Sequence, residues 1–128
     1  MIDHVTLRVA DYDRSKAFYL AALGPLGYRC MMEFDLPGVG KFGGFGVAKP
    51  ELWIAPASAE HITPFGLHLA LGAERRAQID AFHAAALAAG ATDDGKPGLR
   101  AEYHPGYYGA FVIDPDGIRL EVCKHSPE

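Results

Sequence analysis

A repeat that divides the chain in half constrains its fold more than any other feature. The segment HVTLRVADYDRSKAFYLAALG begins at His4, and HLALGAERRAQIDAFHAAALAAG begins 64 residues later at His68, in a chain of 128 residues. An offset of half the chain indicates a duplication, and the sequence therefore predicts two copies of one structural unit. With the two histidines aligned, three further pairs match without a gap: Leu7 and Leu71, Phe18 and Phe82, and Leu23 and Leu87.

The first copy has the pattern of a strand, a helix and three further strands. Polar and apolar residues alternate over Ile2–Val9, which is typical of a strand with one buried face. Asp11 or Asp13 can cap a helix that runs to about Leu23, where Gly24 and a proline end it. Three strand-like runs separated by Gly and Pro follow, at Leu26–Phe34, Phe42–Ala48 and Glu51–Ala55.

The second copy repeats this order of elements. A strand is expected at Phe65–Leu71, and a helix at Glu74–Ala89 whose buried stripe is Ile79, Phe82, Ala86 and Ala89. The sequence Asp-Pro-Asp-Gly then suits a hairpin turn between the last two strands. We therefore predict an α+β fold in which a single domain over 1–128 contains two βαβββ modules, about 1–56 and about 65–128. The last three strands are expected at about Leu99–Tyr103, Tyr107–Ile113 and Ile118–Lys124.

Charge and composition exclude several classes of protein. The formal net charge is −4 and no basic cluster is present, so we expect no nucleic-acid partner. No apolar run approaches the roughly 18 residues that span a bilayer, and no basic segment followed by an apolar one opens the chain. We therefore expect neither membrane insertion nor secretion. Cys30 and Cys123 form no CxxC pair, which predicts reduced thiols in a cytoplasmic protein.

Alternation along the predicted strands gathers three polar side chains into a candidate metal site. His4 and His68 lie opposite the apolar face of the first strand of each copy, and Glu121 lies opposite the apolar face of the last strand. These side chains converge if the sheet curves inward on the side away from the helices. Two imidazoles and one carboxylate form the triad of non-haem Fe(II) oxygenases, and they also suit Mn, Ni, Co or Zn. The alternative for each histidine alone is a partly buried side chain with a structural role.

Three segments make the chain similar to a known superfamily. They are IDHVTLRVADYDRSKAFYLAALGPLGY at the start, GLHLAL in the middle and YHPGYYGAFVIDPDGIRLEVCKH near the end. Over essentially its whole length the chain resembles the vicinal oxygen chelate superfamily, which includes glyoxalase I, extradiol ring-cleaving dioxygenases, methylmalonyl-CoA epimerase, fosfomycin resistance enzymes and bleomycin resistance proteins. The resemblance implies paired βαβββ modules in a cupped mixed sheet with helices on its outer face, often as a homodimer.

The resemblance also implies that His4, His68 and Glu121 are metal ligands. In glyoxalase-like members a fourth ligand comes from the last strand of the first module, where this chain has Trp53. Glu51 lies two residues earlier on the same face and becomes that fourth ligand if the register shifts slightly. With Trp53 in place, the site has three ligands and an aromatic wall for the substrate. That departure weakens the case for a glyoxalase I activity.

Four more residues are candidates for substrate binding and catalysis. Arg8 resembles an arginine of glyoxalase I that holds an anionic part of the substrate, and pairing with a surface acid is the equal alternative. Tyr103 or His104 could act as acid, base or substrate-orienting group, with packing as the alternative. Tyr108 is a candidate substrate-binding residue. Alternation puts Tyr107 on the other face, so the two tyrosines cannot both line the cup.

The other histidines suggest no site from the sequence. His83 falls beside Phe82 in the second predicted helix and is expected to be partly exposed. His61, in the connector Pro56–Pro64, and His125, near the end of the chain, have no obvious partner.

Two functions from different classes are consistent with these residues. The first is a metal-dependent dioxygenase, lyase or isomerase, whose small substrate chelates a divalent metal through vicinal oxygens. The second is a non-catalytic binder of the bleomycin resistance type, in which aromatic residues hold a cationic planar ligand. A degenerate member that serves only as an interaction module is a third, weaker option. The sequence names no substrate.

Overall fold

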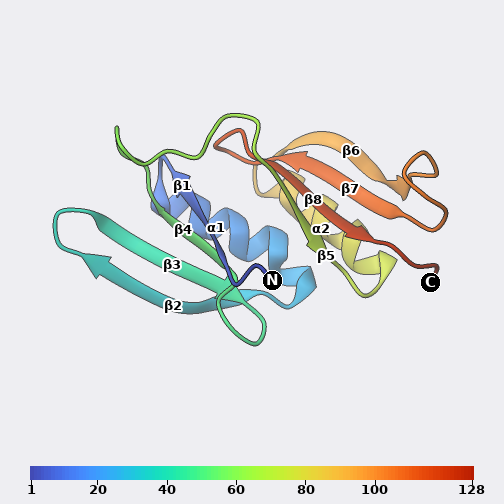
Figure 1. Ribbon diagram of the computed structural model, residues 1–128, viewed down its shortest axis with the longest axis horizontal. Helices are drawn as coiled ribbons and strands as arrows, with labels where there is room; N and C mark the ends of the chain where they lie inside the picture. Colours follow the sequence, from blue (N-terminus) through green and yellow to red (C-terminus); the bar gives the residue numbers. More distant parts are fainter. The chain divides into compact units, whose positions relative to one another are not determined.

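The computed structural model describes residues Met1–Glu128, which form two compact units (Figure 1). The first unit is Met1–Pro64 and the second is Phe65–Glu128. Each contains a strand, a helix and three further strands in that order, and each has one four-stranded mixed sheet. The predicted α+β class and the duplicated βαβββ order are therefore confirmed. Neither α-helix has the length and hydropathy that a membrane-spanning helix requires.

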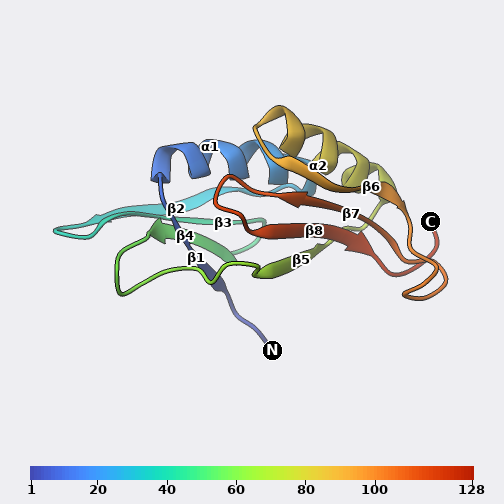
Figure 2. The same ribbon diagram turned by 90° about the horizontal axis from the view of Figure 1, so that it is seen from above.

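The first unit is a sheet covered on one face by a helix (Figure 2). In the sheet order β1-β4-β3-β2, the first pair of strands is parallel and the other two pairs are antiparallel. A short 3-10 helix, Gly24–Leu26, follows α1 where the sequence predicts the helix to end. The elements are β1 (Val5–Val9), α1 (Tyr12–Leu23), β2 (Arg29–Leu36), β3 (Gly40–Gly46) and β4 (Leu52–Pro56).

The second unit repeats this topology. Its sheet order β5-β8-β7-β6 again combines one parallel pair with two antiparallel pairs. The two parallel pairs correspond in register, because Thr6 lies opposite Trp53 and Ala70 lies opposite Glu121. Trp53 therefore occupies the place in the first unit that Glu121 occupies in the second. The elements are β5 (His68–Gly72), α2 (Arg76–Ala88), β6 (Thr92–Leu99), β7 (Tyr108–Ile113) and β8 (Arg119–Lys124).

Each unit has its own apolar core between helix and sheet. Phe18 of α1 and Phe82 of α2, which match in the repeat, are 1% and 0% exposed. Burying a side chain of this size contributes about 1.5–3 kcal/mol. The matched leucines behave differently, since Leu23 is fully buried whereas Leu87 is partly exposed. The two units therefore share the burial of the phenylalanine in the middle of each helix, but not the burial of the leucine near the end of each helix.

Replacing Asp11 tests the predicted start of α1. The Asp11 side chain accepts a hydrogen bond from the backbone nitrogen of Arg14 at 3.0 Å, in the geometry of a helix N-cap. We expect Asp11→Ala to lower the free energy of unfolding by about 1 kcal/mol in urea denaturation. Asp13→Ala removes a charge from the same turn without touching the cap and is expected to cost only a few tenths of that. Equal effects of the two variants would contradict the capping role.

The strand after α2 differs most from the prediction. The sequence predicts a strand at about Leu99–Tyr103, but β6 spans Thr92–Leu99 and Tyr103 lies in a turn. The strand contains Asp-Asp-Gly-Lys-Pro-Gly, residues that are rare in strands. It forms at the edge of the sheet, where only β7 pairs with it and two register shifts between Asp93 and Gly98 accommodate the irregular backbone.

The buried face of α2 also differs from the predicted stripe. Ile79, Phe82 and Ala86 are fully buried as predicted, but Ala89 is the helix C-cap and is only partly buried. His83 is buried instead of partly exposed, and its Nε2 lies 2.9 Å from Asp93 Oδ1. The sequence does not predict this partner, because it predicts the strand at about Leu99–Tyr103 and Asp93 lies on β6.

Candidate functional site

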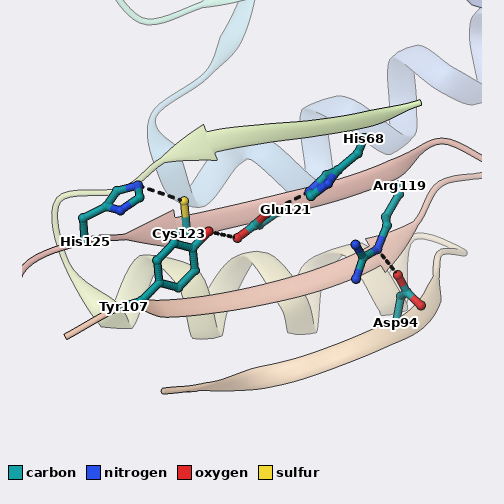
Figure 3. Close-up of polar contacts among 7 residues, drawn as sticks. All are labelled: His68, Asp94, Tyr107, Arg119, Glu121, Cys123 and His125. Atoms are coloured by element: carbon teal, nitrogen blue, oxygen red, sulfur yellow. Dashed lines mark hydrogen bonds and ion pairs between the residues drawn. The ribbon is translucent and has the colours of Figure 1, made fainter. Parts of the chain in front are cut away.

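Glu121 and His68 meet on the sheet of the second unit, on adjacent parallel strands (Figure 3). Glu121 Oε2 lies 2.8 Å from His68 Nε2. The side chain of Glu121, on the strand β8 between β5 and β7, is 4% exposed, whereas that of His68, at the start of β5, is 42% exposed. A carboxylate buried this deeply is unfavourable without partners. The pair therefore combines a buried acid with an imidazole open to solvent.

The second oxygen of Glu121 has a different partner. Tyr107, the residue before β7, donates its hydroxyl to Glu121 Oε1, as Figure 3 shows. Burial, followed by hydrogen bonds with Cys123 and Glu121, raises the pKa of the Tyr107 phenol far above its usual range. Tyr107 therefore stays protonated and acts as a donor. Burial also raises the pKa of the Cys123 thiol, two residues after Glu121.

Three other aromatic rings surround Tyr107. The rings of Tyr103, His104 and His125 each contact it edge to face, with centroid distances of 5.0, 5.3 and 4.9 Å. His104 Nε2 lies 3.0 Å from His125 Nδ1, and His125 Nε2 lies 3.8 Å from the Sγ of Cys123. The contacts form a chain of polar groups from the exposed loop before β7 to the buried carboxylate.

The ring of Tyr107 thus separates the two predicted catalytic residues from Glu121. His104 and Tyr103 both contact Tyr107, and the structure gives neither of them a hydrogen bond to Glu121. Tyr108 faces away from Glu121 toward α2, where its hydroxyl donates to Asp80 Oδ1 at 2.7 Å. As the alternation in the sequence predicts, the two neighbouring tyrosines lie on opposite faces.

The remaining predicted ligands belong to the first unit. His4 precedes β1 instead of lying within it, and its exposed ring has Nδ1 2.8 Å from Asp3 Oδ1. Hydrogen bonds from Lys49 and His4 lower the pKa of Asp3 to about 2. Glu51 accepts a hydrogen bond from the Tyr28 hydroxyl at 2.9 Å. Within the second unit, no third His, Cys, Asp or Glu joins His68 and Glu121 to complete a metal site.

The first unit has a pocket of about 440 Å³ beside Arg8. The guanidinium lies over the ring of Phe42, 5.6 Å from its centroid, and donates to the Pro56 carbonyl at 3.3 Å. It forms no ion pair within its own unit. Phe42 stacks on Phe34, which in turn contacts Trp53. Aromatic and apolar walls with one cation are typical of a small-molecule site. The lining residues are Arg8, Leu36, Gly38, Val39, Phe42, Pro56, Ala57, Ser58, Glu60 and His61.

Comparison with protein families matches residues 1–122 to the Glyoxalase/Bleomycin resistance protein/Dioxygenase superfamily. This chain belongs to that superfamily. The match spans both units and both residues of the His68–Glu121 pair. Comparison with curated proteins gives no match.

Solved structures of the glyoxalase type share the fold. A glyoxalase/bleomycin resistance protein from Albidiferax ferrireducens T118 is 29% identical, with a TM-score of 0.77 over 94% of this chain and 96% of that one. A putative glyoxalase from Bacillus halodurans is 27% identical, with a TM-score of 0.65 over 96% and 94%. The E144Q variant of glyoxalase I from Zea mays is 24% identical, with a TM-score of 0.71 over 94% of this chain and 45% of that one, and shows likeness of fold alone.

Tyr107 contacts Glu121 although the sequence predicts no site role for it. In the β7–β8 register, Phe111 lies opposite Glu121 and Gly109 lies opposite Cys123. Side chains two residues apart in a strand lie on the same face, and Tyr107 lies two residues before Gly109. Alternation therefore places Tyr107 on the same face of the sheet as Glu121. Gly109 is the signal in the sequence for this contact, since a Cβ at that position would lie only 3.2 Å from Tyr107 Cε1.

Proposed function

We propose that this chain is a metal-dependent enzyme whose small substrate chelates a divalent metal through two vicinal oxygens. The observation that carries the proposal is the buried Glu121 carboxylate with an imidazole nitrogen 2.8 Å from one of its oxygens. A strand that packs only for stability has no need of a buried acid at this position. Membership of a superfamily that includes dioxygenases and glyoxalases supports the same function.

The donor set suits a first-row divalent metal. His68 offers a nitrogen ligand and Glu121 an oxygen ligand, and this combination serves Fe, Mn, Ni, Co and Zn. We propose His4 as the third ligand and Glu51 as a possible fourth. When bound, such a metal supplies a Lewis acid for negative charge that develops on a substrate oxygen. The reaction class is a ring-cleaving dioxygenation, a lyase reaction or an isomerisation.

The other predicted residues have supporting roles in this proposal. Arg8 would hold an anionic part of the substrate, and the half-buried guanidinium in an aromatic pocket supports that role. Trp53 would form an aromatic wall. Tyr108 is not proposed to contact this substrate, because its hydroxyl donates to Asp80 on the helix side of the sheet. His104 or Tyr103 would act as acid, base or orienting group. We expect a homodimer, and two cysteines without a disulfide support a cytoplasmic location.

One observation favours a second function, a non-catalytic small-molecule binder. The pocket beside Arg8 has a volume of about 440 Å³, within the range of ligand sites, and its residues all lie in the first unit. Binding there requires no metal. A bleomycin-resistance-like protein would therefore bind its ligand tightly in the absence of any cation.

Metal analysis tests the proposed enzyme directly. Protein purified without a tag or chelator is expected to contain close to one equivalent of Fe, Mn, Ni, Co or Zn. His68→Ala should lose this metal because it removes one of the few strong ligands, and His4→Ala should lose it if the third ligand comes from the first unit. The control is His83→Gln, which removes the other imidazole–carboxylate contact of the second unit, 2.9 Å long, and should retain the metal.

The outcomes separate the two functions. Metal that is present in the parent and in His83→Gln but absent from His68→Ala supports the enzyme. The metal found then directs the assay, which is oxygen consumption for Fe or Mn and isomerase activity for Ni or Zn. A parent that binds no cation after anaerobic reconstitution contradicts the metal-dependent function and favours the binder.

A further inference from the structure

The two oxygens of Glu121 are not equivalent. Oε2 faces His68 on β5, and Oε1 accepts a hydrogen bond from Tyr107, the residue before β7 (Figure 3). The last torsion of a glutamate side chain has a broad, two-fold distribution of angles, so the backbone alone does not choose which oxygen points where. A hydrogen-bond donor on one side of the carboxylate fixes this torsion, and here the donor is the Tyr107 hydroxyl.

Tyr107 is built into this position from several elements. A side chain at Gly109 would place its Cβ 3.2 Å from Tyr107 Cε1 and 3.4 Å from Glu121 Oε1, so the glycine leaves the space in which the ring reaches the carboxylate. The edges of Tyr103, His104 and His125 hold the ring from the loop before β7 and from the end of the chain. Such a restrained phenol loses little conformational entropy when it donates.

We infer that Tyr107 is a positioning residue that holds Glu121 by one oxygen and presents the other, Oε2, beside His68. The effect of Tyr107 on a bound cation rests on the proposed function. With one oxygen held by Tyr107, Glu121 would offer the cation only its other oxygen, which would leave more coordination positions open for a substrate with two donor oxygens. Hydrogen-bond partners of metal ligands commonly change metal affinity by 10–100-fold when they are removed. Tyr107 acts through Glu121 and is not assigned a contact with substrate.

Tyr107→Phe tests this inference because it keeps the ring and removes only the hydroxyl. We expect the dissociation constant for Co²⁺, measured by absorption titration, to rise about 10–100-fold, and the visible spectrum of bound Co²⁺ to change. In the metal-free protein, the ¹⁵N shifts of the His68 ring should also change, because Glu121 is free to rotate away from Nε2. The control is Tyr12→Phe, which removes a phenol–carboxylate hydrogen bond to Glu33 in the first unit and should alter none of these readouts.

Gly109→Ala is a second test that removes no polar group. Its new methyl group would press on Tyr107 and Glu121, so the His68 ring shifts should move in the same direction as in Tyr107→Phe, with a smaller loss of Co²⁺ affinity. Parent-like Co²⁺ affinity and parent-like His68 shifts in Tyr107→Phe would overturn the positioning role. If the parent itself binds no Co²⁺, the proposed metal function fails, while the His68 shifts of the metal-free variants still decide the role of Tyr107.

Discussion

Replacing Glu121 by leucine and Tyr107 by phenylalanine in the same chain is expected to abolish cation binding and to stabilise the metal-free protein. Glu121 is 3% exposed, and its desolvation opposes folding in the absence of a cation. Exchanging buried charged groups for apolar ones of similar volume is often neutral or stabilising by about 1–4 kcal/mol. We therefore expect the free energy of unfolding in urea to rise by about that amount, with no Co²⁺ bound.

The matching control is the pair Tyr12→Phe and Glu33→Leu. It removes the same two chemical groups from a contact in which Glu33 is exposed and also pairs with Lys16 at 2.8 Å. Its effect on stability should stay within about 1 kcal/mol, since exposed ion pairs contribute little. If the Glu121 and Tyr107 double variant is instead destabilised by more than about 2 kcal/mol, the buried contact is structural and Glu121 loses its main claim to a functional role.

Phe82→Ala and Phe18→Ala are each expected to lower the free energy of unfolding by about 3–5 kcal/mol. Each ring belongs to the helix of its own unit and is buried in the core, and removing either leaves a cavity that the fully buried neighbours cannot fill. A total stability of about 5–15 kcal/mol is usual for a domain, so either variant should be visibly unstable at 37 °C. Urea denaturation followed by circular dichroism measures the change.

Leu87→Ala on α2 and Leu20→Ala on α1 are the controls for these two variants. Both leucines are more than a third exposed, so each replacement should cost less than about 1 kcal/mol. Phenylalanine variants that cost no more than their leucine controls would contradict the expected contribution of the two rings to their cores. A large cost in one unit alone would show that only that core limits the stability of the chain.

Most of the fold could be predicted because its signals are local. The helices carry a buried stripe and end at glycine, and the strands other than β6 alternate or follow the hairpin turn. β6 could not be found in this way, since glycine and proline are rare in strands and β6 pairs only with β7, at the sheet edge. His83 was misjudged for the same reason: its partner Asp93 lies on that strand.

The candidate site also has parts that the sequence predicts and parts that it does not. Alternation and the repeat placed His68 and Glu121 on one face, and the structure brings their side chains to 2.8 Å. The same alternation separated Tyr107 from Tyr108 correctly. It assigned no partner to His125, because that histidine meets His104 across a gap of 21 residues in the sequence. Nothing in the spacing of residues predicts such a contact.

The sequence by itself determined the duplication, the α+β class and the strands that carry His68 and Glu121, because the periods of helix and strand are properties of the backbone. Only the tertiary structure decided which oxygen of Glu121 faces His68. That choice depends on a hydrogen bond from Tyr107, on the space left by Gly109 and on rings supplied by a loop and by the end of the chain. Side-chain hydrogen bonds and close packing act over a few ångströms in space, and distance along the chain does not encode them.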